Sequence, residues 1–118
     1  MKLQLEKSGL EIFFKTWQVM VLKYLESHPE GSTSRVVCNS INDSIRISRA
    51  SVINFLEDMA DAGYLHRRYE TGKGGRHGIY RLKKSIDSLL TSLLEDTVKR
   101  LAEEFPSKRE YMLRALEA

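Results

Sequence analysis

One stretch, from Ile47 to Gly63, constrains the fold of this chain more than any other. Ser48 is a favourable N-cap residue, and Gly63 is a favourable residue just beyond a helix C-terminus. Ile47 precedes the cap and can pack on Val52 as a hydrophobic staple. The sequence therefore predicts a single helix of about four turns between these two ends.

The first two turns of this predicted helix carry side chains suited to reading DNA bases. On an ideal helix one side is apolar and faces a core, with Val52, Phe55, Leu56, Met59 and Ala60. The early turns present Arg49, Ala50, Ser51, Ile53 and Asn54, where a helix in the major groove touches base edges. The acidic residues come later, which suits a helix that enters the groove at a tilt.

A basic β-hairpin is predicted directly after this helix. Two short runs of β-forming residues, 64–69 and 79–82, flank the glycine-rich segment ETGKGGRHG, which we interpret as the hairpin tip. A helix followed by a basic hairpin is typical of a winged helix-turn-helix domain. Other small α+β domains also place a hairpin after a helix, so the pattern needs support from charge.

The positive charge of the chain is concentrated in this hairpin. Residues 63–84 have a net charge of +6, whereas the segments before and after have −1 and −2. Such a localised basic patch attracts polyanions, although a solvated charged surface would have the same composition. With 118 residues the chain can form one compact domain and one additional element.

Two helices are predicted before residue 47. Ser8 and Glu11 have capping-box spacing, and apolar residues recur at helical intervals from Leu10 to Leu25, which predicts a continuous first helix. The segment HPEG at 28–31 ends it. A short second helix follows the N-cap candidates at 32–34 and ends at Asn42-Asp43-Ser44. This second helix and the 47–63 helix form the predicted helix-turn-helix pair.

The C-terminal segment is predicted to mediate dimerisation. Apolar residues define a helix from about Ser85 to Glu104, Pro106 ends it, and a short helix spans about 108–116. Its apolar side covers roughly 180°, wider than a single packing partner requires, and a second copy of the chain is the simplest additional partner. The expected contact residues are Ile86, Leu89, Leu90, Leu93, Leu94, Thr97, Val98, Leu101 and Phe105, with Leu93 and Leu94 at the centre.

Catalytic and metal-binding patterns are missing from the sequence. His28, His66 and His77 stand at no metal-ligand spacing with one another or with Cys38, the single cysteine. The chain contains no GxSxG or HExxH motif, and its GKGG lacks the spacing of a phosphate loop. No apolar run reaches 18 residues. We therefore expect a cytoplasmic protein without enzyme activity, metal, cofactor or membrane contact.

Several motifs resemble the penicillinase and methicillin-resistance repressor family, the BlaI/MecI/CopY type. These motifs are TWQVMVLKYL at Thr16–Leu25, GSTSRVV at Gly31–Val37, ISRAS at Ile47–Ser51, DAGYL at Asp61–Leu65 and GIYRL at Gly78–Leu82. ISRASVINFL followed by GKGGRHGIYRL is especially similar to archaeal members. The resemblance covers roughly residues 12–105, and PadR-type and MarR-type regulators share the same general plan.

The resemblance implies a homodimer that binds a two-fold DNA operator. It places Arg49, Ala50, Ser51, Ile53 and Asn54 at base-reading positions and the hairpin arginines on phosphates. Phe13, Phe14 and Lys15 stand where the family has a cap and acidic residues, so we expect the first helix to begin earlier here. The cysteine cluster of the copper-responsive members is missing, so copper sensing is not expected.

The combined expectation is a mainly α protein with a small β-hairpin. Residues 8–84 form a winged helix-turn-helix DNA-binding domain, and residues 85–118 form a helical dimerisation segment. The predicted partner is double-stranded DNA, contacted by Thr33, Ser34, Arg46, Ser48, Arg49, Ala50, Ser51, Ile53, Asn54, Arg67, Arg68, Lys73, Arg76 and His77. The alternative is a winged-helix module that binds another protein, which would not need cations around the 47–63 helix.

Overall fold

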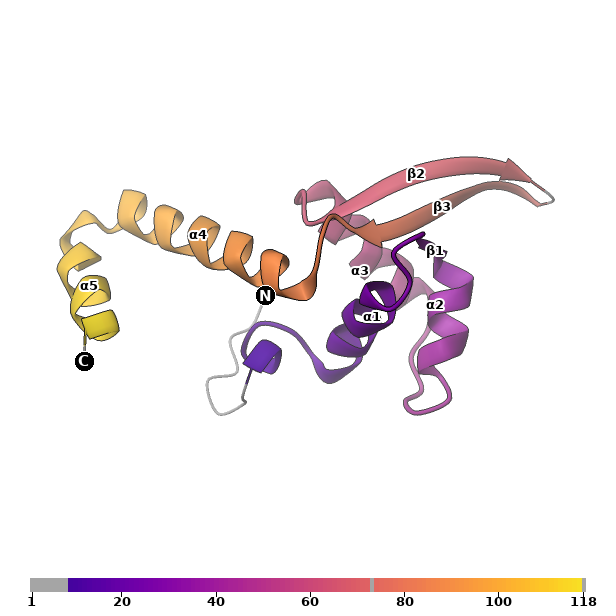
Figure 1. Cartoon of the computed structure of the whole chain (residues 1–118), viewed down its shortest axis with the longest axis horizontal. Coiled ribbons are helices and arrows are strands. Elements are labelled where there is room, and N and C mark those ends of the chain that lie inside the picture. Colours follow the sequence, from indigo (N-terminus) through magenta and orange to yellow (C-terminus); the bar gives the residue numbers. More distant parts are fainter. Residues whose placement is uncertain (1–8, 73, 118) are drawn as a thin grey trace.

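The computed structural model describes residues 9–72 and 74–117, which form a three-helix domain with a β-hairpin and a long C-terminal helical arm (Figure 1). The helices of the domain are α1 (Thr16–Glu26), α2 (Ser34–Ile41) and α3 (Arg49–Asp61). The strands are β1 (Ser32–Thr33), β2 (Leu65–Gly72) and β3 (Gly75–Leu82), and the arm contains α4 (Ile86–Glu104) and α5 (Arg109–Glu117). Short 3-10 turns lie at Gly9–Ile12 and Pro106–Lys108. The predicted mainly helical, winged-helix fold is confirmed.

Both predicted ends of α3 are confirmed. The Ser48 hydroxyl accepts a hydrogen bond from the Ser51 backbone N–H at 3.1 Å, so Ser48 is the N-cap. Gly63 adopts a φ of +89° after the helix, and its N–H donates to the Ala60 carbonyl at 3.0 Å. The local cap residues therefore fix the length of α3.

The prediction of one continuous N-terminal helix is wrong. A 3-10 turn precedes a break, and α1 begins only at Thr16, so the helix does not start early as we expected. Phe14 turns into the core, where it is 3% exposed and meets the ring of Phe55 edge-on. Lys15 is extended, with its N–H bonded to Gln18 Oε1 at 2.9 Å. Burying the Phe14 ring thus interrupts the helix. Ser8, the proposed cap, lies outside the described residues.

The wing is longer than predicted and has a much shorter tip. The three-stranded antiparallel sheet has the order β1-β3-β2. Gly72 pairs with Gly75, so most of ETGKGGRHG belongs to the strands and only two residues separate them. Strand β1, which was not predicted, pairs Ser32 with Tyr80 and Thr33 with Ile79. This pairing ties the start of α2 to the wing.

Gly31 allows the chain to enter β1 close to β3. Its φ is +98°, a conformation that side chains with a Cβ rarely adopt. A Cβ at this position would also lie 2.8 Å from Ile79 Cγ2. Both constraints favour glycine here.

The side chain of Asn42 holds the connection between α2 and α3. Its Nδ2 donates to the Cys38 carbonyl at 2.7 Å and to the Ile47 carbonyl at 3.2 Å, and its Oδ1 accepts from the Ile47 N–H at 3.1 Å. Asn42 therefore ends α2, as predicted, and also fixes the segment that enters α3. Cys38, next to this connection, is buried, with 7% of the residue exposed.

The apolar side of α4 divides into two stripes with different roles. Leu89 and Leu93 are each 5% exposed and pack, with Ile86, on the core of their own domain. Polar contacts add to this attachment, since the Ile86 N–H donates to Glu26 Oε2 at 2.7 Å and the Tyr64 hydroxyl donates to Asp96 Oδ2 at 2.8 Å. The rest of α4 projects from the domain (Figure 1). The expectation that Leu93 lies at the centre of a contact between chains therefore needs correction, because Leu93 is a core residue of the single chain.

Candidate nucleic-acid interface

A groove between α2, α3 and the wing gathers many of the predicted DNA-contact residues. It contains residues from the start of α2, the exposed side of α3 and the inner face of the hairpin. The residues that line it are Thr33, Ser34, Arg35, Val36, Arg49, Ile53, Glu57, Tyr69, Arg76, His77, Gly78 and Tyr80. One face of the domain thus combines the start of α3 with cations from three segments.

The first two turns of α3 present the side chains expected to read bases. Arg49, Ala50 and Asn54 are exposed, and Ile53 is half-buried in the wall of the groove. Ser48 and Ser51 are less available, because the Ser48 hydroxyl caps the helix and donates to Ser51 Oγ at 2.8 Å. The side chains that remain accessible at the start of α3 are therefore those of Arg49, Ala50 and Asn54, with Ile53 beside them.

The start of α2 contributes residues that were only partly identified from the sequence. Thr33 Oγ1 accepts from the Val36 N–H at 3.3 Å, so Thr33 acts as the N-cap, and Ser34 follows it in the groove wall. Arg35 and Val36, both missed, also line the groove, and Val36 is 46% exposed although it is apolar. The short apolar pattern of α2 gave no reason to exclude Val36 from the core.

Arg76 and Tyr69 form a stacked pair on the inner face of the wing. The guanidinium carbon of Arg76 lies 3.8 Å from the centre of the Tyr69 ring, and Tyr69 is 42% exposed. A flat aromatic surface holds a guanidinium without taking its hydrogen-bond donors. Arg76 can therefore offer those donors to a phosphate. Tyr69 was not among the residues predicted from the sequence. The alternation of side chains along a strand, which places Tyr69 on the same face as Leu65 and Arg67, could have indicated it.

Arg67 and Arg68, both predicted to contact DNA, lie on opposite faces of β2. Arg67 Nη1 donates to Glu57 and, at 3.0 Å, to Asp61 Oδ1, so two carboxylates of α3 hold its charge. Arg68 is exposed on the other face and pairs with Glu70 at 3.4 Å. The two arginines therefore differ in their surroundings, because neighbouring residues in a strand point to opposite sides.

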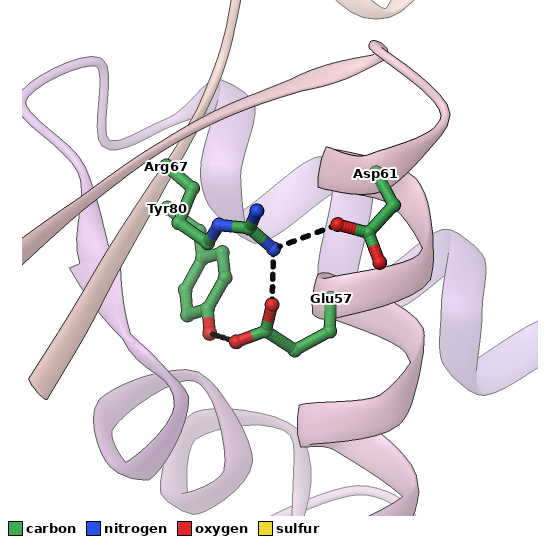
Figure 2. Close-up of polar contacts among 4 residues, drawn as sticks. All are labelled: Glu57, Asp61, Arg67 and Tyr80. Atoms are coloured by element: carbon green, nitrogen blue, oxygen red, sulfur yellow. Dashed lines mark hydrogen bonds and ion pairs between the residues drawn. The ribbon is translucent and has the colours of Figure 1, made fainter.

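Glu57 links α3 to both strands of the hairpin (Figure 2). Its Oε1 accepts a hydrogen bond from the Tyr80 hydroxyl at 2.6 Å, and its Oε2 accepts from Arg67. Burial of the ring and this hydrogen bond raise the pKa of the Tyr80 phenol well above its ordinary value. The phenol therefore remains protonated and serves as the donor.

The remaining candidates occupy different places. His77 lines the groove, whereas Arg46 is exposed in the connection before α3 and does not line it. Lys73 lies outside the described residues. Within the described residues, no group of three His, Cys, Asp or Glu side chains is arranged to hold a metal ion.

An exposed apolar stripe runs along the outer part of α4. Leu94, Val98, Leu101 and Phe105 are each between 43% and 52% exposed and repeat at intervals of four, three and four residues. On an ideal helix this stripe lies roughly a third of a turn from the core-facing one. Tyr111, Leu113 and Leu116 on α5 are also exposed. None of the helices in the described part of the chain is long and apolar enough to cross a membrane.

No family model matches the sequence, and no curated protein matches it closely enough to count as a relative. Solved structures do match the fold. A possible transcriptional regulator from Methanosarcina mazei Go1 has a TM-score of 0.59 at 15% identity, over 81% of this chain and 80% of its own. A PadR family transcription regulator from Clostridium difficile R20291 has a TM-score of 0.52 at 16% identity, over 77% of this chain and 98% of its own.

A PadR family transcriptional regulator from Eggerthella lenta DSM 2243 has a TM-score of 0.50 at 20% identity, and it covers 72% of this chain and 82% of its own. These identities are low, so the similarity concerns the fold. The chain has the winged-helix fold found in transcriptional regulators and is structurally similar to members of the PadR family.

Proposed function

We propose that this protein is a cytoplasmic transcriptional repressor that binds an inverted-repeat DNA operator as a homodimer. The observation that carries the proposal is the groove in which the exposed early turns of α3 lie beside the basic inner face of the wing. The solved structures of similar fold are described as transcription regulators, which supports the same function. The proposal includes the BlaI/MecI resemblance, which rests on the sequence motifs alone.

The two kinds of side chain at this face have separate tasks. Contacts to phosphates position a protein on DNA, whereas contacts to base edges select a sequence. Arg49 and Asn54 stand on the exposed side of α3 and can reach bases in the major groove. Arg76 on the wing and Arg35 at the start of α2 flank this helix and can reach the backbone on either side. The groove therefore offers both specificity and affinity.

The outer stripe of α4 supports the homodimer. A large apolar surface is unfavourable in water, and a two-fold contact covers the same patch on both copies. The arm of α4 and α5 projects from the domain, so two arms can pair while both α3 helices stay free for DNA (Figure 1). Two half-sites related by a two-fold axis are the matching operator.

A gel-shift titration with random duplex DNA, followed by selection of binding sites from a random library, tests this function. We expect salt-sensitive binding to any duplex and a selected consensus with two-fold symmetry. A chain that binds no duplex at low salt would contradict the proposal. It would favour the alternative of a module that meets another protein through the exposed Val36 and the groove around it.

The change Asn54→Ala should relax sequence preference at one position in each half-site. An asparagine amide can bond adenine N6 and N7 together, and such a contact contributes about 1–3 kcal/mol of discrimination. Site selection with the variant measures the preference, and its affinity for random duplex at low salt serves as the internal control. An unchanged consensus would remove Asn54 from the residues that read bases.

The double change Lys73→Ala with Arg76→Ala should weaken the salt dependence of DNA binding. Removing one cation from a phosphate lowers the slope of log K against log salt by about 0.9, so the slope should fall by up to about two units per subunit. The selected consensus should survive, because interactions with phosphates carry no base information.

A matched control removes Lys83 and Lys84, which carry the same total charge but line a separate hollow at the base of α4. Titrations at three salt concentrations compare the two double variants. Equal slopes for both would show that the hairpin cations form only a solvated surface.

A further inference from the structure

Glu57 lines the groove between α2, α3 and the wing, where a carboxylate has two possible roles. It could accept a hydrogen bond from a cytosine amino group, which is a known mode of base recognition. Here, however, Oε1 is bonded to the Tyr80 hydroxyl and Oε2 to the Arg67 guanidinium. Both oxygens are engaged with the wing, so the geometry favours a role inside the protein.

Arg67 is likewise engaged in contacts within the protein. Its Nη1 bridges Glu57 and Asp61, which lie one turn apart on α3. A guanidinium whose positive charge is already balanced by two carboxylates attracts a phosphate less than an unpaired guanidinium does. Figure 2 shows that the four side chains meet between the helix and the two long strands.

The absence of a side chain on Gly78 allows the Tyr80 hydroxyl to reach Glu57. These two residues lie on the same face of β3, and the Tyr80 ring runs back along the strand over Gly78. A Cβ on Gly78 would lie 2.6 Å from the Tyr80 hydroxyl oxygen and 2.9 Å from Cζ. The Tyr80 residue is only 3% exposed, so its ring has little room to move elsewhere.

We propose that Glu57, Arg67 and Tyr80 are positioning residues that hold the wing at a fixed distance from α3, so that wing and helix contact DNA in one register. This inference rests on the proposed DNA-binding function. In the distal half of the hairpin the described residues, 69–72 and 74–77, are all exposed, so no helix of the described chain covers it. Its direction therefore depends on contacts near its base, and this network is placed there.

The network also keeps a negative charge from acting on the DNA. An unpaired Glu57 carboxylate in the groove would repel phosphates. Arg67 neutralises it and Tyr80 satisfies its other oxygen. Loss of Arg67 should therefore free the wing and expose a repulsive charge together, whereas loss of Glu57 or of the Tyr80 hydroxyl should only free the wing.

The variant Tyr80→Phe tests the inference, because it removes one hydroxyl and keeps the buried ring. Tyr64→Phe is the matched control, since it removes a tyrosine hydroxyl that bonds Asp96 on α4, outside the groove. Hydroxyl-radical footprints on the selected operator report wing contacts and α3 contacts separately. For Tyr80→Phe we expect loss of the wing protections, a salt slope lower by about one unit, and retention of the α3 consensus.

Two further variants and one measurement on the free protein complete the test. Glu57→Ala should reproduce the loss, and Glu57→Gln, which keeps an acceptor for one partner, should restore part of the wing protection. In the DNA-free protein, the amides of β2 and β3 should exchange faster in Tyr80→Phe than in Tyr64→Phe. Wing protections unchanged in both Tyr80→Phe and Glu57→Ala would overturn the inference alone. A failure of the unmodified chain to bind any duplex would instead overturn the proposed function, and the inference with it.

Discussion

The double change Leu94→Glu with Val98→Glu should convert the protein from dimers to monomers and weaken operator binding by about 100-fold or more. Two linked half-sites bind more tightly than one by about 10²–10⁴-fold, because the second contact is intramolecular. Leu94 and Val98 are 46% and 48% exposed, so the single chain does not need them for its own core. Two glutamates in an apolar contact would have to be buried without partners, which is strongly unfavourable.

The choice of residues makes this test specific. Leu93 is adjacent but belongs to the domain core, so Leu93→Glu would detach α4 and report on folding. The control Ser92→Glu with Lys99→Gln changes the net charge by the same amount at exposed positions on the other side of α4. Sedimentation at micromolar concentration measures the oligomeric state of the unmodified chain and of both double variants. Titration of operators with one and with two half-sites measures their DNA affinity. A monomeric unmodified chain, or a dimer that survives both glutamates, would exclude this interface.

The helix α3 could be predicted to its ends because every signal that defines it is local. Ser48 and Gly63 lie at the helix boundaries, and their hydrogen bonds reach no further than four residues. The same holds for α4, where Ser85 caps the first turn and Pro106 follows the last. Where the determinants are within one turn of the element, sequence alone suffices.

Elements that depend on distant partners could not be predicted. The break before α1 arises because Phe14 packs on Phe55, about forty residues away in the chain, and the local helical pattern gave no sign of it. Strand β1 has two residues and exists only through its pairing with Ile79 and Tyr80. Its sequence, Ser32-Thr33, suggested a helix cap, and Thr33 is indeed also the cap of α2.

The candidate interface was predicted as a region more accurately than as a set of side chains. The early turns of α3 and the basic hairpin lie together, as the order of the elements required. The composition did not show which cations are paired with carboxylates of α3 and which are exposed. Arg67 and Arg68 look equivalent in sequence, yet the register of β2 places one against Glu57 and the other in solvent. Only the pairing of the strands separates a positioning arginine from an exposed one.

The change Gly78→Ala should destabilise the fold and break the hydrogen bond between Tyr80 and Glu57. The added Cβ would lie 2.6 Å from the Tyr80 hydroxyl oxygen, a separation that atoms do not tolerate, so the ring must shift. The ring is buried and its hydroxyl is bonded to Glu57 at 2.6 Å, so any shift costs packing or the hydrogen bond. Overpacking of this kind costs about 1–3 kcal/mol, and a loss of about 2 kcal/mol lowers Tm by roughly 8 °C for a domain of this size.

Gly72→Ala is the matched control on the same hairpin. Neither Gly72 nor Gly78 has a positive φ, and a Cβ on Gly72 would meet only His77 Cδ2 at an ordinary 3.9 Å. Its Tm should therefore stay close to that of the unmodified chain or rise slightly. In a Tyr80→Phe background the closest clash is gone and the hydrogen bond is already lost, so Gly78→Ala should lower the stability less than in the unmodified chain. Thermal unfolding of the unmodified chain, the two single variants and the double variant measures this difference. Equal losses of stability in both backgrounds would show that the Tyr80 hydroxyl is not what requires glycine at position 78.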